Sequence, residues 1–233
     1  PVLATGKKER AILKTGEEPD DYLKQAVTPH HLRGYNRLLR RLGELGDVTF
    51  GEWREPADIR RRTEEFLALE SQGWKGRKGT AMTIDRYRAA FTREALFNLA
   101  ERSLCRIHTL DLNGKAIASL VIMRETGVAY TWKTAYDESF ARFSPGALLM
   151  IDATRRLLDD PDIVRADSLA VPDHPVMTRL WKERETMQTL LIGLNPGSDR
   201  AVRQAASQIE LYRRTRNVAR LVRDKFNDMF GNR

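Results

Sequence analysis

The dipeptide Asn113-Gly114 is the feature that most restricts how this chain can fold. It separates two apolar runs, RIHTLDL (106–112) and KAIASLVIM (115–123). Asn-Gly favours the positive φ angles of a type I′ turn, whose twist matches that of two paired antiparallel strands. A third apolar run, VAYTWKTAY (128–136), follows a few residues later. The sequence therefore predicts a three-stranded antiparallel meander in the middle of the chain.

The third run leads into Ser144-Pro145-Gly146, which opens an apolar helical stretch that ends near Leu158. Serine at the N-cap and proline at the first helical position are typical of a helix start. Glycine inside a helix costs about 0.5–1 kcal/mol relative to alanine, so a helix start alone does not explain Gly146. Glycine also allows a ligand to approach the backbone closely. This hinge is therefore either a helix cap or an anion site.

Periodicity along the rest of the chain predicts further helices and strands. From the run VTFGEW (48–53) onwards the expected order is β-α-α-β-β-β-α-β-α-β, followed by a helical tail. The helix that starts near Thr83 is expected to carry an apolar face of Ile84, Tyr87, Phe91, Ala95 and Leu99. This order predicts a mixed α/β fold, an α+β mixed sheet with helices on both faces. The expected parts are an N-terminal extension or linker (1–27), a main domain (28–195) and a basic C-terminal helix (196–233).

The composition indicates a globular protein with anionic partners. The 233 residues carry a formal net charge of +8, which favours nucleotides, nucleic acid, acidic lipid or polyanionic sugar. No run approaches the roughly 18 apolar residues of a membrane helix, and the first residues lack the apolar core of a secretory signal. The lone Cys105 excludes an internal disulfide and fits a reducing cytoplasm. The four histidines show no metal-ligand spacing, so no metal is expected.

Three stretches resemble the GNAT acetyltransferases encoded in bacterial cellulose and exopolysaccharide gene clusters. The most specific is TAYDESFARFSPGALLMIDAT (134–154), which contains the hinge. The others are LALESQGWKGRKGTA (67–81), with its glycine-rich basic loop, and the arginine-rich LRGYNRLLRRLGELG (32–46). The resemblance implies a GNAT-like acyl-CoA N-acyltransferase fold with an extra C-terminal helix. It also implies acetyl-CoA as the acyl donor and, as acceptor, an amine or hydroxyl of a sugar or envelope precursor.

The same resemblance implies that the hinge binds the phosphates of the donor. The N–H groups at a helix N-terminus and the positive end of the helix dipole attract an anion. Arg142, just before the hinge, would add a charged donor. The strand that enters the hinge would flank the acyl group. The expected donor-binding residues are Thr134, Ala135, Arg142, Ser144, Pro145, Gly146, Ala147 and Leu148.

Acyl transfer needs a base for the incoming nucleophile and an acid for the departing thiolate. Tyr136 is the expected acid. The candidates for the base are Glu70, Asp167, Asp173 and His174. The expected acceptor contacts are Trp74, Arg77, Asp137 and Trp181. Each has a structural alternative, since strand tyrosines mostly pack their rings and helix-end glutamates are mostly solvated.

Two other functions stay open. The basic stripes of the helix 32–46 and of the C-terminal helix would fit an aminoacyl-tRNA-dependent transferase of the same fold. A non-catalytic interaction module would fit two departures: no Tyr-Lys pair follows the strand after the hinge, and Arg142 and Gly146 lie one residue further apart than in the general GNAT loop.

The expected partners beyond acyl-CoA and a sugar-type acceptor depend on the C-terminal helix. It would pack on its own domain or on another chain, as in a homodimer or a polysaccharide synthesis complex. Alternatively it would lie on an acidic membrane surface. Nucleic acid is the less expected partner. The expected location is the cytoplasm, peripheral to the inner membrane. Because the chain begins at Pro1 rather than Met, we expect it to be part of a longer protein.

Overall fold

The computed structural model describes the backbone of residues 1–230 and the side chains of residues 1–215. The strands are β1 (Val2–Lys14), β2 (Val48–Trp53), β3 (Cys105–Leu112), β4 (Lys115–Glu125), β5 (Val128–Tyr136), β6 (Arg165–Asp167) and β7 (Glu183–Ile192). The helices are α1 (Pro19–Ala26), α2 (Pro29–Gly43), α3 (Pro56–Gln72), α4 (Trp74–Arg77), α5 (Arg86–Ala100), α6 (Pro145–Asp159), α7 (Met177–Leu180) and α8 (Asp199–Phe230). Two short 3₁₀ helices are η1 (Met82–Ile84) and η2 (Glu138–Phe143).

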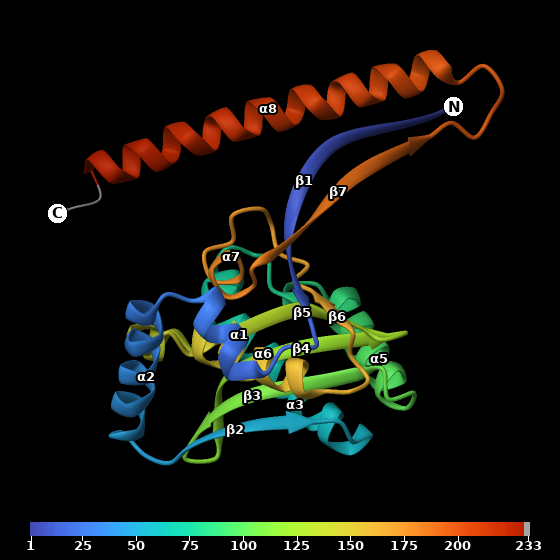
Figure 1. Cartoon of the computed structure of the whole chain (residues 1–233). Coiled ribbons are helices and arrows are strands. Elements are labelled where there is room, and N and C mark those ends of the chain that lie inside the picture. Colours follow the sequence, from blue (N-terminus) through green and yellow to red (C-terminus); the bar gives the residue numbers. More distant parts are fainter. Residues whose placement is uncertain (231–233) are drawn as a thin grey trace. The chain divides into compact units, whose positions relative to one another are not determined.

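The strands form a mixed sheet in the order β2-β3-β4-β5-β6-β1-β7 (Figure 1). The pairs β2–β3, β3–β4, β4–β5 and β1–β6 are antiparallel, and β5 and β6 are parallel. The prediction of a mixed α/β fold is confirmed. Because a parallel neighbour requires a crossover, the chain leaves β5 through η2 and α6 before it returns as β6.

The predicted meander is confirmed as β3, β4 and β5. Asn113 and Gly114 have φ angles of 51° and 75°, as a type I′ turn requires. β3 is buried along its whole length, because it lies between β2 and β4 with helices on both sides.

Two compact units divide the chain. Arg10–Arg184 contains the strands β2 to β6 and the helices α1 to α7. Pro1–Glu9 and Glu185–Arg233 form the other, with the start of β1, most of β7, and α8. The domain limits expected after residues 27 and 195 stay a prediction.

Helices cover both faces of the sheet in the unit Arg10–Arg184. On one face α1, α2 and α6 pack around buried side chains such as Leu42 and Leu149. On the other face α3 and α5 pack around Phe66 and Leu96. The sheet therefore has one face covered by α6 and an opposite face covered by α3. These are called the α6 face and the α3 face below.

The structure adds detail to two expected segments. The segment 1–27 contains β1 and α1. The apolar face predicted for α5 is not its buried face: Tyr87 and Phe91 are exposed, and α5 buries Ala89, Thr92 and Leu96. The Tyr87 ring lies under the guanidinium of Arg86, which lets the aromatic ring remain at the surface.

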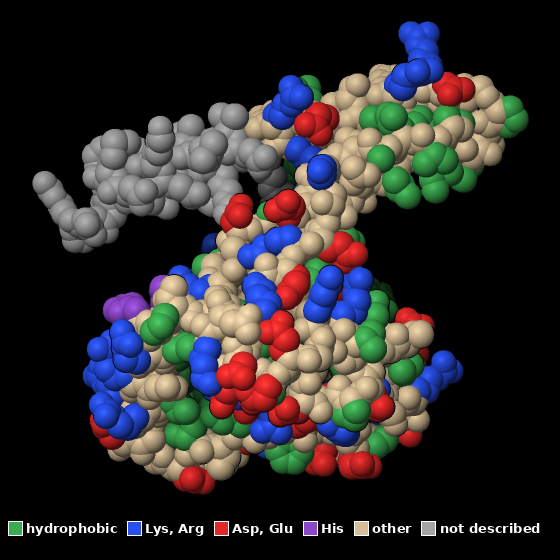
Figure 2. Space-filling model, in the orientation of Figure 1, with side chains coloured by type: hydrophobic (Ala, Val, Ile, Leu, Met, Phe, Trp, Pro, Cys, Tyr) green, Lys and Arg blue, Asp and Glu red, His purple; other side chains and the backbone are tan. Residues whose placement is uncertain are grey.

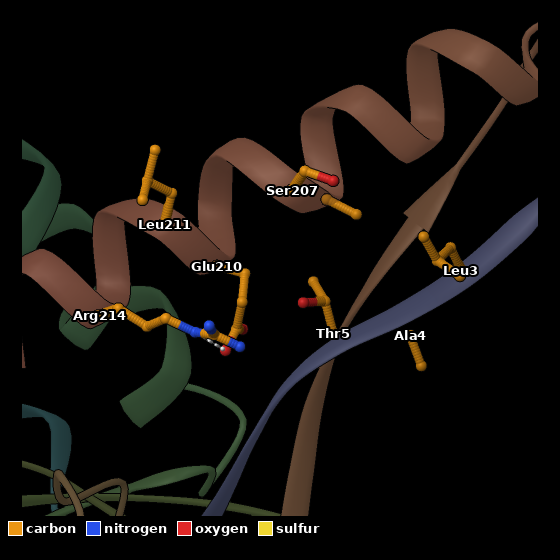
Figure 3. A pocket seen from close by; sticks show the side chains of 8 residues that line it. Leu3, Ala4, Thr5, Ser207, Glu210, Leu211 and Arg214 are labelled. Carbon is orange, nitrogen blue, oxygen red and sulfur yellow. Dashed lines mark hydrogen bonds and ion pairs between the residues drawn. The ribbon is translucent and has the colours of Figure 1, made fainter.

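The unit formed by Pro1–Glu9 and Glu185–Arg233 has its own packing. Gly6 has a φ of +65°, and the guanidinium of Arg213 lies where a side chain on Gly6 would be. Arg213 also donates to Thr189 Oγ1 at 2.8 Å. A cavity of about 440 Å³ lies between the start of β1 and α8 (Figure 3) and is lined by Leu3, Ala4, Thr5, Ala206, Ser207, Glu210, Leu211 and Arg214. None of these lining residues is a predicted site residue.

The basic character predicted for residues 216–233 lies outside the described side chains. Across the described residues, no helix has both the length and the hydropathy that a membrane crossing would require.

Candidate active site

β5 has an open edge where it separates from β6. The parallel ladder between the two strands ends at Tyr130 and Asp167. The Thr131 hydroxyl then donates to the Ser168 carbonyl at 2.8 Å, and the chain turns away at Leu169, whose φ is 46°. β5 itself continues to Tyr136. The last third of the strand therefore has a partner in β4 but none in β6.

The register of β4 and β5 decides which backbone groups face this opening. The Asp137 N–H donates to the Ile117 carbonyl next to β4 at 2.8 Å. Because alternate residues direct their N–H and C=O groups to the same side, Thr134 and Tyr136 direct theirs away from β4. The Thr134 carbonyl accepts a hydrogen bond from Lys75 Nζ at 2.9 Å. For the N–H groups of Thr134 and Tyr136, no partner is found among the described residues.

The start of α6 differs from the cap that the sequence predicts. Ser144 has left-handed backbone angles, φ 52° and ψ 51°, and its side chain makes no cap hydrogen bond. Its carbonyl accepts instead from the N–H groups of Ala147 at 2.9 Å and Leu148 at 3.1 Å. These two N–H groups are therefore engaged within the first turn of the helix. Pro145 has no N–H, so Gly146 supplies the available amide of this turn.

Gly146 joins the start of α6 to the open edge. Its φ is not positive, and a Cβ on it would lie 3.5 Å from Tyr136 Cδ1 and 3.8 Å from Thr134 Cγ2, which is ordinary contact. The fold thus does not require glycine at this position. The space that a Cβ on Gly146 would occupy lies beside Thr134 and Tyr136 of the open edge. The Gly146 N–H has no partner within the described part of the chain.

Arg142 adds a cation near this amide. Its guanidinium is exposed, lies 4.8 Å from the Phe143 ring centroid, and has no carboxylate partner among the described side chains. The Gly146 N–H, the positive end of α6 and Arg142 together suit a phosphate, and the edge N–H groups suit amides or a carbonyl. The residues present therefore fit the expected acyl-CoA donor.

The remaining donor-binding candidates contribute backbone or packing. Pro145, Ala147 and Leu148 are buried in α6, and their side chains belong to the core. Ala135 is buried on the α3 face, away from Gly146.

The acid candidate Tyr136 lies on the open edge with its ring packed against the core. No hydrogen-bond partner for its hydroxyl is found among the described residues. The hydroxyl is thus available to a ligand at the edge.

Two of the four base candidates are engaged in ion pairs. Asp167 is buried, binds Arg10 at 3.0 Å and accepts from the Leu169 N–H at 2.8 Å. Glu70 is buried between Lys75 and Lys133, both at 3.0 Å. Burial alone would raise the pKa of Glu70, but the Met82 N–H and the two ammonium groups hold that pKa below its ordinary value. Both carboxylates are thus engaged by cations, and the lowered pKa makes Glu70 a weaker base.

His174 and Asp173 lie in the loop after β6, as predicted. Burial lowers the pKa of His174, which keeps the ring neutral. Its Nδ1 accepts from the Met177 N–H at 3.3 Å, so the neutral ring carries its proton on Nε2. His174 would therefore donate rather than accept. Asp173 is exposed, has a φ of 58°, and has no Lys or Arg partner among the described side chains.

Of the residues expected to contact the acceptor substrate, Trp74, Arg77 and Asp137 lie around η2, whereas Trp181 lies in the core. Glu138 accepts from the Trp74 N–H and from Arg77 Nη2, both at 2.5 Å, and so ties the loop after α3 to η2. Asp137 caps η2 through Ser139, at 2.9 Å for the N–H and 2.7 Å for the hydroxyl. Trp181 is fully buried and donates to Thr154 Oγ1 at 3.0 Å, so it is not part of the site proposed below.

Sequence reasoning missed Lys75, Lys133 and Glu138. Lys75 lies in the glycine-rich basic loop that the resemblance singled out, and this loop was the available signal. Lys133 and Glu70 are 63 residues apart, so no local pattern pairs them.

The surface over α2 is basic. Figure 2 shows Lys and Arg side chains gathered at this end of the molecule. The exposed arginines of α2 have no carboxylate partner among the described side chains; they are Arg33, Arg37, Arg40 and Arg41. No group of three or more His, Cys, Asp or Glu side chains suited to a metal ion occurs in the described residues.

Solved structures share this fold at low sequence identity. A conserved protein of unknown function from Bacteroides thetaiotaomicron matches with a TM-score of 0.53 and 15% identity, over 82% of this chain and 62% of its own. The C-terminal domain of a putative lysylphosphatidylglycerol synthetase from Agrobacterium fabrum matches with a TM-score of 0.53 and 12% identity, over 89% of this chain and 66% of its own. This chain thus spans slightly less than two-thirds of either protein.

These identities show the fold alone. Among curated protein sequences, none matches this chain significantly. The family model described as an acetyltransferase (GNAT) domain matches residues 30–170, which contain the open edge of β5 and the start of α6. The chain therefore belongs to the GNAT acetyltransferase family.

Proposed function

We propose that this chain transfers an acetyl group from acetyl-CoA, bound along the open edge of β5, to an amine or hydroxyl of a sugar or an envelope or exopolysaccharide precursor. The observation that carries the proposal is the continuity of the edge at Thr134 and Tyr136 with the free amide of Gly146. Membership of the GNAT family supports acetyl-CoA as the donor. Acetyl-CoA supplies an activated thioester. The chain itself therefore needs to bind the donor, orient the acceptor beside it, and transfer protons.

Four groups would hold the donor. The Gly146 N–H and Arg142 would bind its phosphates at the start of α6. The N–H groups of Thr134 and Tyr136 would pair with its amides and polarise its carbonyl, because they are fixed by the strand and need no reorganisation. β6 leaves this edge uncovered, which gives the donor access.

Proton transfer would involve Tyr136 and Asp173. The Tyr136 hydroxyl would protonate the departing thiolate. Asp173 would accept the proton of the nucleophile, since the other carboxylate candidates are held by cations. His174 would orient the acceptor through its Nε2 proton.

The sugar acceptor is supported by the resemblance of the stretch 134–154 to acetyltransferases of exopolysaccharide gene clusters. Homodimerisation, membership of a polysaccharide synthesis complex, contact with an acidic membrane and a cytoplasmic location stay predictions.

Release of free thiol from acetyl-CoA in the presence of amino sugars tests the proposal. We expect acceptor-dependent release, and an acetylated product by mass spectrometry. Tyr136→Phe and Asp173→Asn should each lower kcat by about 100-fold, the usual contribution of a general acid or base, with the KM for acetyl-CoA unchanged. His174→Gln should raise the KM for the acceptor more than it lowers kcat. Thiol release at the wild-type rate in Tyr136→Phe or in Asp173→Asn would refute the role of that residue.

A second candidate, an aminoacyl-tRNA-dependent transferase, is favoured by the unpaired arginines of α2. A filter-binding titration of tRNA at several salt concentrations separates it from the first. For tRNA as substrate, affinity should fall steeply with salt, and Arg37→Gln should reduce the slope by about one ion. A flat salt dependence would leave acetyl-CoA as the donor.

A further inference from the structure

Glu70 lies near the C-terminal end of α3, and three groups surround its buried carboxylate. Its Oε1 accepts hydrogen bonds from Lys75 Nζ and Lys133 Nζ, both at 3.0 Å. Its Oε2 accepts from the Met82 N–H at 2.8 Å. A buried carboxylate requires such partners, and these contacts satisfy it.

The two lysines carry more positive charge than Glu70 balances. Two ammonium groups against one carboxylate leave one positive charge, and no second carboxylate lies within ion-pair distance of either lysine among the described side chains. The nearby Arg77 does not change this balance, because Glu138 pairs with it at 2.5 Å.

The ammonium groups also have hydrogen-bond donors to spare. Each carries three N–H donors. Lys75 uses one on Glu70 and one on the Thr134 carbonyl, and Lys133 uses one on Glu70. Of six donors, three therefore remain. The side chains of Lys75 and Lys133 are 20% and 22% exposed, so an entering ligand can reach them.

The lysines and the start of α6 lie on opposite sides of the same edge. Side chains alternate along β5, so Lys133 lies on the same face as Ala135, which packs in the core under α3 and α5. Thr134 lies on the other face, against Gly146. Lys75 reaches the edge itself, through the Thr134 carbonyl.

We propose that Lys75 and Lys133 bind an anionic group of the acceptor, a carboxylate or a phosphate, and so select acidic acceptors over neutral ones. This inference rests on the proposed acetyl transfer along the β5 edge. An anion bound here would balance the extra positive charge of the two lysines. It would also accept hydrogen bonds from their three remaining N–H groups. Because the donor's phosphates have Gly146 and Arg142 on the α6 face, the anion on the α3 face belongs to the acceptor. The acceptor is thus an amine or hydroxyl compound that also carries an acid group.

Calorimetric titration of the full chain with inorganic phosphate, and separately with acetate, tests the anion site. Saturating acetyl-CoA fills the α6 side in one series and is left out of a second. We expect saturable millimolar binding, weakened about tenfold or more in Lys133→Gln and retained in Lys133→Arg. Lys182→Gln is the matched control, because Lys182 is a part-exposed lysine that Glu17 pairs with at 2.8 Å.

Phosphate binding that is unchanged in Lys133→Gln, or absent from the wild-type chain, would overturn the site and leave the lysines as partners of Glu70 alone. Thermal unfolding checks that each variant folds. Should Lys133→Gln fail to fold, Lys75→Gln tests the same claim, since Lys75 carries the other ammonium group.

Matched acceptors test the selectivity. If the site binds a phosphate, kcat/KM should be about tenfold higher for glucosamine 6-phosphate than for glucosamine. If it binds a carboxylate, kcat/KM should be about tenfold higher for glycine than for glycinamide. Lys133→Gln should remove the preference and change the KM for acetyl-CoA less than about twofold. A large rise in that KM would place the lysines in the donor site and refute the acceptor assignment. Failure of acetyl-CoA to bind at all would refute the proposed function, while the phosphate titration without acetyl-CoA would still test the lysines.

Discussion

At the scale of single residues, His108 couples the stability of this fold to pH. It is 1% exposed in the middle of β3, and its two ring nitrogens have no hydrogen-bond partner among the described residues. Burial lowers the pKa of His108 to about 4, against the opposing effect of Glu52 at 4.0 Å and with the help of Arg156 and Arg106. The imidazole is therefore neutral in the folded chain and protonates more readily in the unfolded chain.

The unfolded chain then binds more protons than the folded chain between pH 6.5 and about pH 4. The free energy of unfolding should therefore fall as pH falls through this window, by up to about 3 kcal/mol from His108. Urea unfolding of the wild-type chain and of His108→Gln at pH 7 and pH 4 measures this. The variant should lose that much less stability on acidification. Parallel pH profiles would show that His108 is already charged or already solvated in the folded chain.

At the scale of elements, the start of α6 shows a helix that begins without a side-chain cap. Ser144 occupies the N-cap position in a left-handed conformation that costs a non-glycine residue about 1 kcal/mol, and its carbonyl takes the first helical N–H groups. The helix dipole and the free Gly146 amide thus remain available to a ligand.

Substitution of Ser144 separates this helix start from a conventional cap. Ser144→Gly should raise the free energy of unfolding by up to about 1 kcal/mol, because glycine adopts a positive φ without strain. Ser144→Ala should change it little, because no side-chain hydrogen bond is lost. Chemical denaturation measures both. A loss of about 1 kcal/mol in Ser144→Ala would mean that the hydroxyl caps the helix after all.

Local patterns predicted the elements whose signals lie within a few residues. Asn113-Gly114 identified the hairpin, and Ser144-Pro145-Gly146 identified the start of α6 at Pro145. The charged strand β1 was missed because its partner in the sheet, Asp167 opposite Ile12, is far away in sequence. Gly146 was recognised because its signal, a glycine in a helix start, is local. The Glu70–Lys133 pair was missed because its two residues are far apart in the sequence.

At the scale of the whole molecule, the chain divides into two compact units. The proposed donor site lies within Arg10–Arg184, and the other unit depends on the close approach of Arg213 to Gly6. The proposed donor site and the contact between Gly6 and Arg213 have no residue in common.

Gly6→Ala should therefore loosen one unit and spare the other. Its φ of +65° strains alanine by about 1 kcal/mol, and the Cβ displaces Arg213 from Thr189. Hydrogen exchange should speed up in residues 1–9 and 185–215, while the Kd for acetyl-CoA should stay within about twofold of wild type. A Kd weakened about tenfold would show that acetyl-CoA binding depends on both units.

Calorimetric titration of the full chain with acetyl-CoA tests the central claim, that the donor binds where the β5 edge meets the start of α6. The variants are Gly146→Ala and Arg142→Gln. Gly34→Ala is the matched control, because it lies in a helix with open space where its Cβ would be. Gly146→Ala should keep or slightly raise stability, since alanine suits a helix better and its Cβ meets only ordinary contacts.

We predict micromolar binding by the wild-type chain and by Gly34→Ala. In Gly146→Ala the Cβ narrows the space beside the edge, so binding should weaken about tenfold or more, which corresponds to about 1.4 kcal/mol. Loss of the guanidinium in Arg142→Gln should weaken it similarly. Equal binding by all four proteins, or none at millimolar acetyl-CoA, would contradict this account.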